Sequence, residues 1–195
     1  MDYYQLISQL LTNSILKKEK EYDFQEFSME NWETFLELSI QHKITPILYQ
    51  YLEPSKGQIN IPDNILSKMR QINLNNAVRN TLLLHEVGTI FSKLSQAGLC
   101  AISLKGLHLV DNVYDNISLR SMSDVDILLR KVDIPKALPI LEVLGYQPTT
   151  YFDINDQNID IKHVPPLLKK NGPYLELHWT LLEENEPFSI DTHGL

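Results

Sequence analysis

Apolar residues in the first half of the chain recur at helical spacing. They return every three or four positions over residues 32–40 and again over 83–94, as helices with one buried face require. The run "TPILYQYL" (45–52) predicts another short helix, and 53–63 predicts a loop whose last residue, Asp63, would cap the helix that follows. We therefore expect residues 1–96 to form a helical N-terminal lobe.

Short apolar runs replace the helical pattern from residue 97 onward. The segment "LCAISL" (99–104) is bounded by glycines and predicts a buried strand, while "DVDILLR" (124–130) and "YLELHWTL" (174–181) alternate as strands do. Two weaker strand candidates are "YQPTTYF" and "NIDIKH". Residues 97–195 are thus expected to contain a small mixed sheet.

One helix is expected between these strands, over "DIPKALPILEVLGY". Asp133 would cap its N-terminus and Gly145 would follow its end, while Pro139 should delay or kink the helix. The fold class predicted is α+β: a small mixed β-sheet core with flanking helices, preceded by the helical lobe.

Composition narrows the range of functions. The net charge of −8 disfavours a protein that coats nucleic acid, because that mode of binding needs clustered Lys and Arg. No apolar run is long enough for a membrane span and the N-terminus lacks a signal-peptide pattern, so a soluble, cytoplasmic protein is expected. The single cysteine, Cys100, is expected to be a small buried residue.

Two carboxylates separated by one residue are the first chemical signal. In a strand, Asp124 and Asp126 share one face while Val125 and Ile127 take the other. Carboxylates held this close repel each other, so they need a cation or exposure to solvent. Mg²⁺ prefers carboxylate oxygens and completes its shell with water and substrate phosphates. The solvent face of an edge strand is the alternative interpretation of the same pair.

A third acid lies on another alternating strand. Glu176 shares a face with His178, and the leucines beside it take the opposite face. Three acids from two strands can hold two metal ions about 4 Å apart, which suits phosphoryl displacement. His178 would ligate, orient a carboxylate or contact phosphate, or serve as a structural hydrogen-bonding residue.

The pair Lys105–Gly106 stands between a predicted strand and a helical segment. Glycine there lets a phosphate approach the free N–H groups of a helix N-terminus, and Lys105 would add a positive charge. A turn glycine beside an exposed lysine would give the same sequence.

The ordered combination of these motifs resembles a known family. The segments "LKGLHLVDNVYDNISLRSMSDVDILL", "LGY", "IKHVPPL" and "LELHW" resemble the uncharacterised nucleotidyltransferase family of bacteria within the DNA polymerase β-like superfamily. The resemblance is strong over residues 99–182 and weak in the helical region.

This resemblance implies roles for particular residues. Asp124 and Asp126 match the metal-binding aspartates and Glu176 the third carboxylate, and all three are implied to be catalytic. A further set is implied to bind the nucleotide: Lys105, Gly106, Arg120, Ser123 and His178. For Arg120, a surface ion pair with Asp111 or Asp115 is the alternative.

Some features depart from the family pattern. Leu107 replaces the small residue that usually follows the motif glycine, and the spacing from Gly106 to Asp124 is long. The chain stops soon after the last motif strand, so we expect a short or C-terminally shortened member.

The function expected is Mg²⁺-dependent (or Mn²⁺-dependent) nucleotidyl transfer. A nucleoside monophosphate would move from an NTP, the co-substrate, to a hydroxyl-type acceptor with release of pyrophosphate. The acceptor would be a small molecule or a protein, with nucleic acid disfavoured and no membrane partner. The alternative is a catalytically inactive nucleotide-binding or scaffold protein with the same fold.

Overall fold

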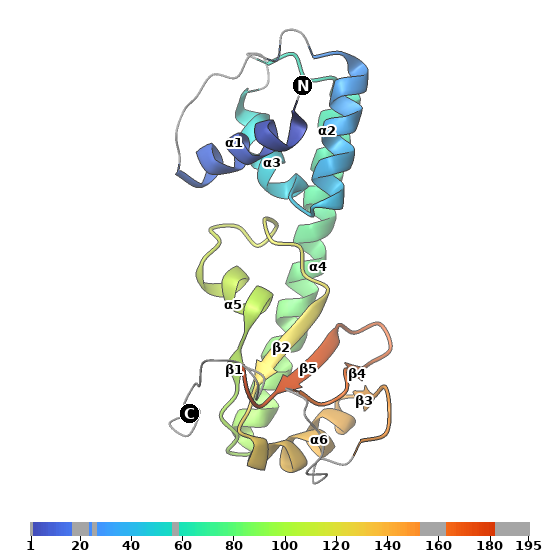
Figure 1. The fold of residues 1–195 in the computed structure, drawn as a ribbon. Coiled ribbons are helices and arrows are strands. Elements are labelled where there is room, and N and C mark those ends of the chain that lie inside the picture. The colour runs from blue at the N-terminus through green and yellow to red at the C-terminus, as the bar shows by residue number, and fades with distance from the viewer. Residues whose placement is uncertain (1, 17–23, 25–26, 56–58, 153–162, 182–195) are drawn as a thin grey trace. The chain divides into compact units, whose positions relative to one another are not determined.

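The computed structural model describes residues 2–16, 24, 27–55, 59–152 and 163–181. Its contacts divide the chain into two compact units (Figure 1). The first unit comprises residues 1–80 and 114–121, and the second comprises 81–113 and 122–195. The described part is mixed α+β, with a helical N-terminal region and a five-stranded sheet, as the sequence predicts.

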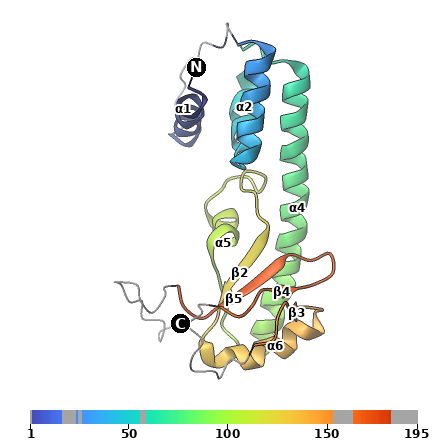
Figure 2. The same cartoon turned by 45° about the vertical axis from the view of Figure 1, so that its right-hand side comes forward.

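Helices build the first unit. They are α1 (Tyr3–Leu16), α2 (Met29–Gln41), α3 (Thr45–Leu52) with a 3₁₀ turn at Glu53–Ser55, and the first half of α4 (Asp63–Gln96). Figure 2 shows α4 as one continuous helix. Asp63 is the first residue of this helix, whereas a capping role would place it just before the helix.

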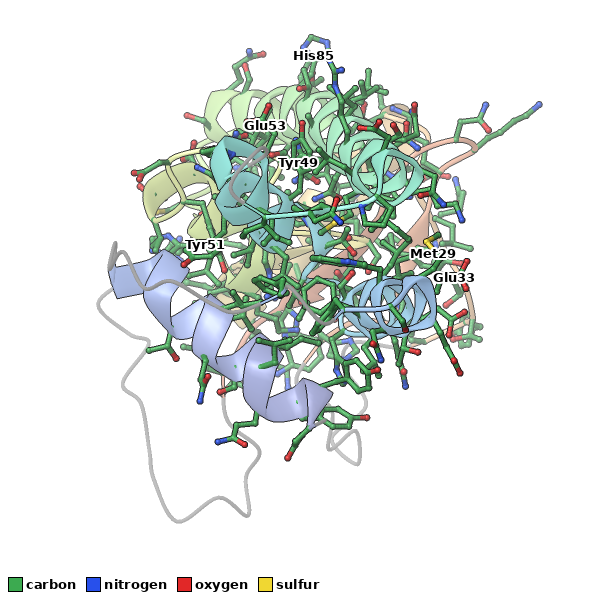
Figure 3. The ribbon with its side chains drawn as sticks, turned by 90° about the horizontal axis from the view of Figure 1, so that it is seen from above. Met29, Glu33, Tyr49, Tyr51, Glu53 and His85 are labelled. Atoms are coloured by element: carbon green, nitrogen blue, oxygen red, sulfur yellow. The ribbon has the colours of Figure 1, made fainter. Side chains whose placement is uncertain are left out.

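The core of this unit lies on one face of α2. Trp32 and Phe35 are almost fully buried, and the Trp32 ring stacks on Phe24 with centroids 5.3 Å apart. Met29 and Glu33, one turn apart, lie on the other side of α2 (Figure 3). Ser28 caps the helix by accepting from the Asn31 N–H, and the Asn31 side chain accepts from the Ser28 N–H. The predicted buried face is therefore confirmed for Trp32, Phe35 and Leu36, but it is wrong for Ile40, which is 48% exposed near the end of the helix.

Two buried asparagine side chains on α4 hold the turn at residues 117–120 by hydrogen bonds. The Asn80 side-chain NH₂ donates to the carbonyls of Ile117 and Arg120, at 2.5 and 2.7 Å, and that of Asn76 donates to the Ser118 carbonyl at 2.5 Å. Asn80 is completely buried. The turn 117–120 is thus fixed to α4 by side chains that satisfy its carbonyl groups.

The sheet belongs to the second unit and has the order β1-β2-β5-β4-β3. Its strands are β1 (Ile102–Ser103), β2 (Asp124–Leu128), β3 (Gln147–Pro148), β4 (Leu167–Leu168) and β5 (Tyr174–His178). The central strands β2 and β5 are parallel and lie side by side (Figure 1), while every other pairing is antiparallel.

Apolar side chains from β2 and β5 form the core of this unit. Val125 and Ile127 on β2, with Leu175 and Leu177 on β5, are completely buried and share one face of the sheet. Leu83, Val87, Ile90 and Leu94 on the second half of α4 are also buried. The opposite face of β2 and β5 is left for the polar residues described below.

Helix α6 (Ile134–Val143) runs through Pro139. Asp133 occupies the N-cap position, yet its carboxylate accepts from Arg130 Nε at 2.7 Å instead of capping the helix. Of the two effects expected of Pro139, the late start is wrong, because α6 begins directly after Asp133, and the kink stays a prediction. Gly145 follows the helix end with φ +92°, a conformation that glycine adopts without strain.

Other expectations need correction. Cys100 is exposed, and the buried strand predicted over 99–104 is reduced to Ile102–Ser103, both of which are only partly buried. The segment 146–152 forms only the two-residue β3, and "NIDIKH" lies outside the described residues except for His163, which makes an isolated bridge with His178. None of the described helices is both long and apolar enough to span a bilayer.

Candidate functional site

The strand register brings three chemically active side chains to one face of the sheet. Asp126 on β2 lies directly opposite Glu176 on β5, and His178 lies two residues further along β5. Paired residues on neighbouring strands project to the same side. The face that is not packed into the apolar core therefore carries two carboxylates and an imidazole.

The three side chains converge closely. His178 Nε2 lies 2.9 Å from Asp126 Oδ1 and 3.3 Å from Glu176 Oε2. One ligand atom from each residue lies within 4.8 Å of the others. Asp126 and His178 are buried, whereas Glu176 is partly exposed. We call Asp126, Glu176 and His178 the carboxylate–histidine cluster.

Lys105 brings a positive charge to this cluster. Its ammonium group forms an ion pair and hydrogen bond with Asp126, and it lies 3.8 Å from Glu176 Oε2. Lys105 is the first residue of α5 (Lys105–Asn112) and has φ +47°. A residue with a side chain is strained in this left-handed conformation, and such strain concentrates at functional sites.

The neighbouring charges shift the pKa values of the buried carboxyl and the lysine. Burial by itself would raise the pKa of Asp126, but the hydrogen bonds from His178 and Lys105 and their positive charges hold it below its ordinary value. Burial would likewise lower the pKa of Lys105, yet the hydrogen bond to Asp126 and the charges of Asp126, Glu176 and Asp124 raise it. Asp126 is therefore ionised and Lys105 protonated at neutral pH.

Asp124 stands apart from the converging group. It is exposed, and its Oδ1 accepts a hydrogen bond from Ser123 Oγ at 3.2 Å. Strand alternation places it on the same sheet face as Asp126, and its negative charge acts on Lys105. Its role as a metal ligand, and that of Ser123 in nucleotide binding, stay predictions.

The remaining predicted residues lie in different parts of the chain. Gly106 is the second residue of α5, next to Lys105. Arg120 is exposed and belongs to the first unit, where its backbone carbonyl accepts from Asn80. The contributions of Gly106 and Arg120 to ligand binding stay predictions. A second histidine lies near the cluster: the His163 ring is 5.0 Å from that of His178, with its Nδ1 2.7 Å from the Val164 carbonyl.

The ion pair between Lys105 and Asp126 is a feature that sequence reasoning missed. The Leu104 N–H donates to the Asp126 carbonyl at 3.0 Å, because β1 pairs antiparallel with β2. This pairing carries the next residue, Lys105, to the Asp126 side chain. The sequence indicates both strands, as the apolar runs 99–104 and 124–130. It does not give the register in which the two strands pair, because that register depends on tertiary packing.

The donor set of the cluster fits a divalent cation. Two carboxylates and an imidazole nitrogen are ligand types that such ions accept in proteins, and their ligand atoms are close enough to converge on one ion. Asp126, ionised and buried, would be the principal anionic ligand.

Comparison with known families agrees with this chemistry. A family model described as uncharacterised nucleotidyltransferase matches residues 28–195. The chain belongs to this nucleotidyltransferase family. Among curated proteins, no relative matches the sequence. This match confirms the predicted resemblance to the uncharacterised nucleotidyltransferase family, whereas placement in the DNA polymerase β-like superfamily stays a prediction. The carboxylate–histidine cluster and the Lys105–Gly106 pair both lie within the matched region.

Membership also gives the cluster a chemical context. Transfer of a nucleotidyl group passes through a phosphorus centre carrying several negative charges, which a cationic site stabilises. The ammonium group of Lys105 and the candidate metal-binding group Asp126, Glu176 and His178 lie together on this face of the sheet. The family assignment supports a transferase.

Proposed function

We propose that this protein is a divalent-metal-dependent nucleotidyltransferase of the DNA polymerase β-like superfamily. It would transfer a nucleoside monophosphate from an NTP to a hydroxyl-type acceptor and release pyrophosphate. The observation that carries the proposal is the convergence of Asp126, Glu176, His178 and Lys105 at one point on the sheet. Family membership supports the same chemistry.

The bond changes follow from this reaction type. The acceptor oxygen forms a bond to the α-phosphorus, the bond from that phosphorus to the bridging oxygen breaks, and pyrophosphate leaves with the electron pair. Glu176, which is partly exposed beside the buried Asp126, would accept the acceptor proton. Mg²⁺ or Mn²⁺, held by Asp126 and Glu176 with Asp124 as the predicted third ligand, would supply Lewis-acid charge stabilisation.

The nucleotide phosphates would be bound by residues around α5 and the start of β2. Lys105 would place its ammonium near the phosphates, and the α5 backbone at Gly106 would allow a close approach. Ser123 is a further predicted phosphate contact in this unit, since a hydroxyl donates to phosphate oxygens. The phosphate contact that the family resemblance implies for Arg120, a residue of the first unit, stays a prediction. The acceptor is proposed to be a small molecule or a protein side chain.

Pyrophosphate release from each NTP, with and without Mg²⁺ or Mn²⁺, tests the proposal. A lysate fraction supplies acceptors, and mass spectrometry identifies any labelled species. Asp126→Asn should reduce release at least about 100-fold, because it removes the principal anionic ligand of the metal ion whose positive charge would stabilise the transition state. The matched control is Asp111→Asn, an exposed aspartate on α5 that should leave release unchanged.

Two outcomes would overturn the enzymatic proposal. Undiminished release by the Asp126→Asn protein would place the chemistry elsewhere. Tight binding of an NTP, measured by calorimetry, without release under any condition would favour a nucleotide-binding or scaffold protein with the same fold.

A further inference from the structure

We propose that His178 is a direct metal ligand and that the cluster therefore selects Mn²⁺ over Mg²⁺. This inference rests on the proposed function for any role of the metal ion in catalysis. The metal site itself is inferred from the positions of the side chains alone. The ligand atoms of Asp126, Glu176 and His178 converge, so His178 would be added to Asp126, Glu176 and the predicted ligand Asp124.

The position of the imidazole nitrogen is the first argument. His178 Nε2 lies within 3.3 Å of an oxygen from each of the two carboxylates, so the nitrogen is directed between them. To bind an ion, Nε2 would give up the hydrogen that it now donates to Asp126, and the ring would carry its remaining hydrogen on Nδ1. The shared approach to Asp126 and Glu176 places Nε2 at a vertex of the ligand set.

The backbone holds this nitrogen in place. His178 is the last residue of β5, and its carbonyl accepts from the Leu129 N–H at 2.9 Å. Its side chain is only 7% exposed, and that of Asp126 is 4% exposed. Two of the three ligands are thus fixed by strand pairing and burial, which lowers the entropy lost when a cation binds.

The neighbouring histidine provides a contrast. His163 pairs with His178 across the bridge and its ring centroid is 5.0 Å away, yet its Nδ1 lies against the Val164 carbonyl. It does not belong to the group whose ligand atoms converge. Partial burial and proximity to β5 alone therefore do not make a histidine part of the site.

Donor chemistry decides between the two ions. Mg²⁺ favours an all-oxygen shell in near-ideal octahedral geometry, with several waters retained. Mn²⁺ accepts the same carboxylates and also binds imidazole nitrogen more strongly than Mg²⁺ does. One nitrogen beside two carboxylates is therefore a set that discriminates in favour of Mn²⁺.

Spectroscopy with Mn²⁺ alone tests the inference without turnover. In the wild-type protein, electron spin echo envelope modulation of bound Mn²⁺ should show coupling to a ¹⁴N nucleus. Labelling histidine with ¹⁵N should change that coupling to a ¹⁵N pattern. His178→Gln should abolish it, and the matched control His163→Gln should retain it.

Competition between the two ions gives an independent measure. Wild-type protein should bind Mn²⁺ at least about tenfold more tightly than Mg²⁺, and His178→Gln should remove most of that difference by weakening Mn²⁺. Circular dichroism of each variant checks folding, and the wild-type and His163→Gln spin-echo spectra together separate His178 from His163 even if His178→Gln does not fold.

Several results would overturn the inference. These are bound Mn²⁺ without histidine nitrogen coupling, coupling that survives in folded His178→Gln protein, or equal affinity for the two ions. Failure of the proposed function would differ, since Mn²⁺ would then bind with nitrogen coupling while no NTP released pyrophosphate.

Discussion

Asp126 is a buried carboxylate whose ionised form depends on the groups around it. Hydrogen bonds from His178 and Lys105 overcome the effect of burial and lower its pKa in the folded protein. A lowered folded-state pKa contributes stability that is present above the unfolded value of about 4 and is lost as the pH falls through the folded value. Asp126 should therefore make the protein more sensitive to acid.

We predict that Asp126→Asn flattens the acid side of the stability profile. The free energy of unfolding, measured with urea from pH 7 down to pH 3, should fall less steeply in the variant than in the wild-type protein. The difference between wild type and variant should shrink below about pH 4. An offset that stayed constant across this range would contradict the assignment, and Asp111→Asn serves as the exposed control.

Lys105 combines a useful charge with an unfavourable backbone conformation. At φ +47° glycine is tolerated better than alanine, and both substitutions remove the ammonium group. The Lys105→Gly protein should therefore be about 1 kcal/mol more stable to urea than Lys105→Ala. His108, an exposed residue further along α5, should show the reverse order, with alanine favoured by about 1 kcal/mol. The same order at both positions would argue against the left-handed conformation of Lys105.

At the scale of elements, α4 fixes a turn through its side chains. Asn80 donates to two carbonyls of the 117–120 turn, and these would lose a buried partner in Asn80→Ala. We predict a loss of about 1–3 kcal/mol in the free energy of unfolding. Asn75→Ala, on the exposed side of the same helix, should change it by no more than about 0.5 kcal/mol. Equal effects from the two variants would show that the turn is held by other contacts.

The strongest periodic patterns predicted their elements best. The alternation in 124–128 and 174–178 gave β2 and β5 and placed Asp126, Glu176 and His178 on polar faces. The alternation of apolar and polar residues along a strand does not determine which strands pair. The sequence therefore did not reveal that β2 and β5 are parallel neighbours. The two-residue β4 follows two prolines and is too short to give a periodic signal.

The arrangement of the site depended on contacts between distant parts of the sequence. The Lys105–Asp126 ion pair spans 21 residues and follows from the pairing of β1 with β2. The left-handed conformation of Lys105 had no signal in its residue type, because lysine ordinarily avoids it. Residue chemistry therefore identified the candidates, whereas tertiary pairing determined which of them converge.

At the scale of the whole molecule, α4 contributes to both compact units. The contacts divide the chain between Asn80 and Thr81, within this one helix, so residues 81–96 group with the sheet. The boundary at 96/97 expected from the sequence stays a prediction about folding units. A continuous helix shared by both units suggests that their stabilities are coupled.

Leu82→Pro tests this coupling. Leu82 is 67% exposed on α4, so Leu82→Ala should change stability little, whereas proline removes a helix hydrogen bond and should cost about 3 kcal/mol. Tryptophan fluorescence can follow the unfolding of each unit separately. Replacing Trp179 with phenylalanine leaves Trp32 as the reporter of the first unit, and replacing Trp32 with phenylalanine leaves Trp179 as the reporter of the second. Urea unfolding followed by either fluorophore should shift to lower midpoint in the proline variant. A shift seen by only one tryptophan would show that the units unfold independently, because the break in α4 would then destabilise only the unit that contains that reporter.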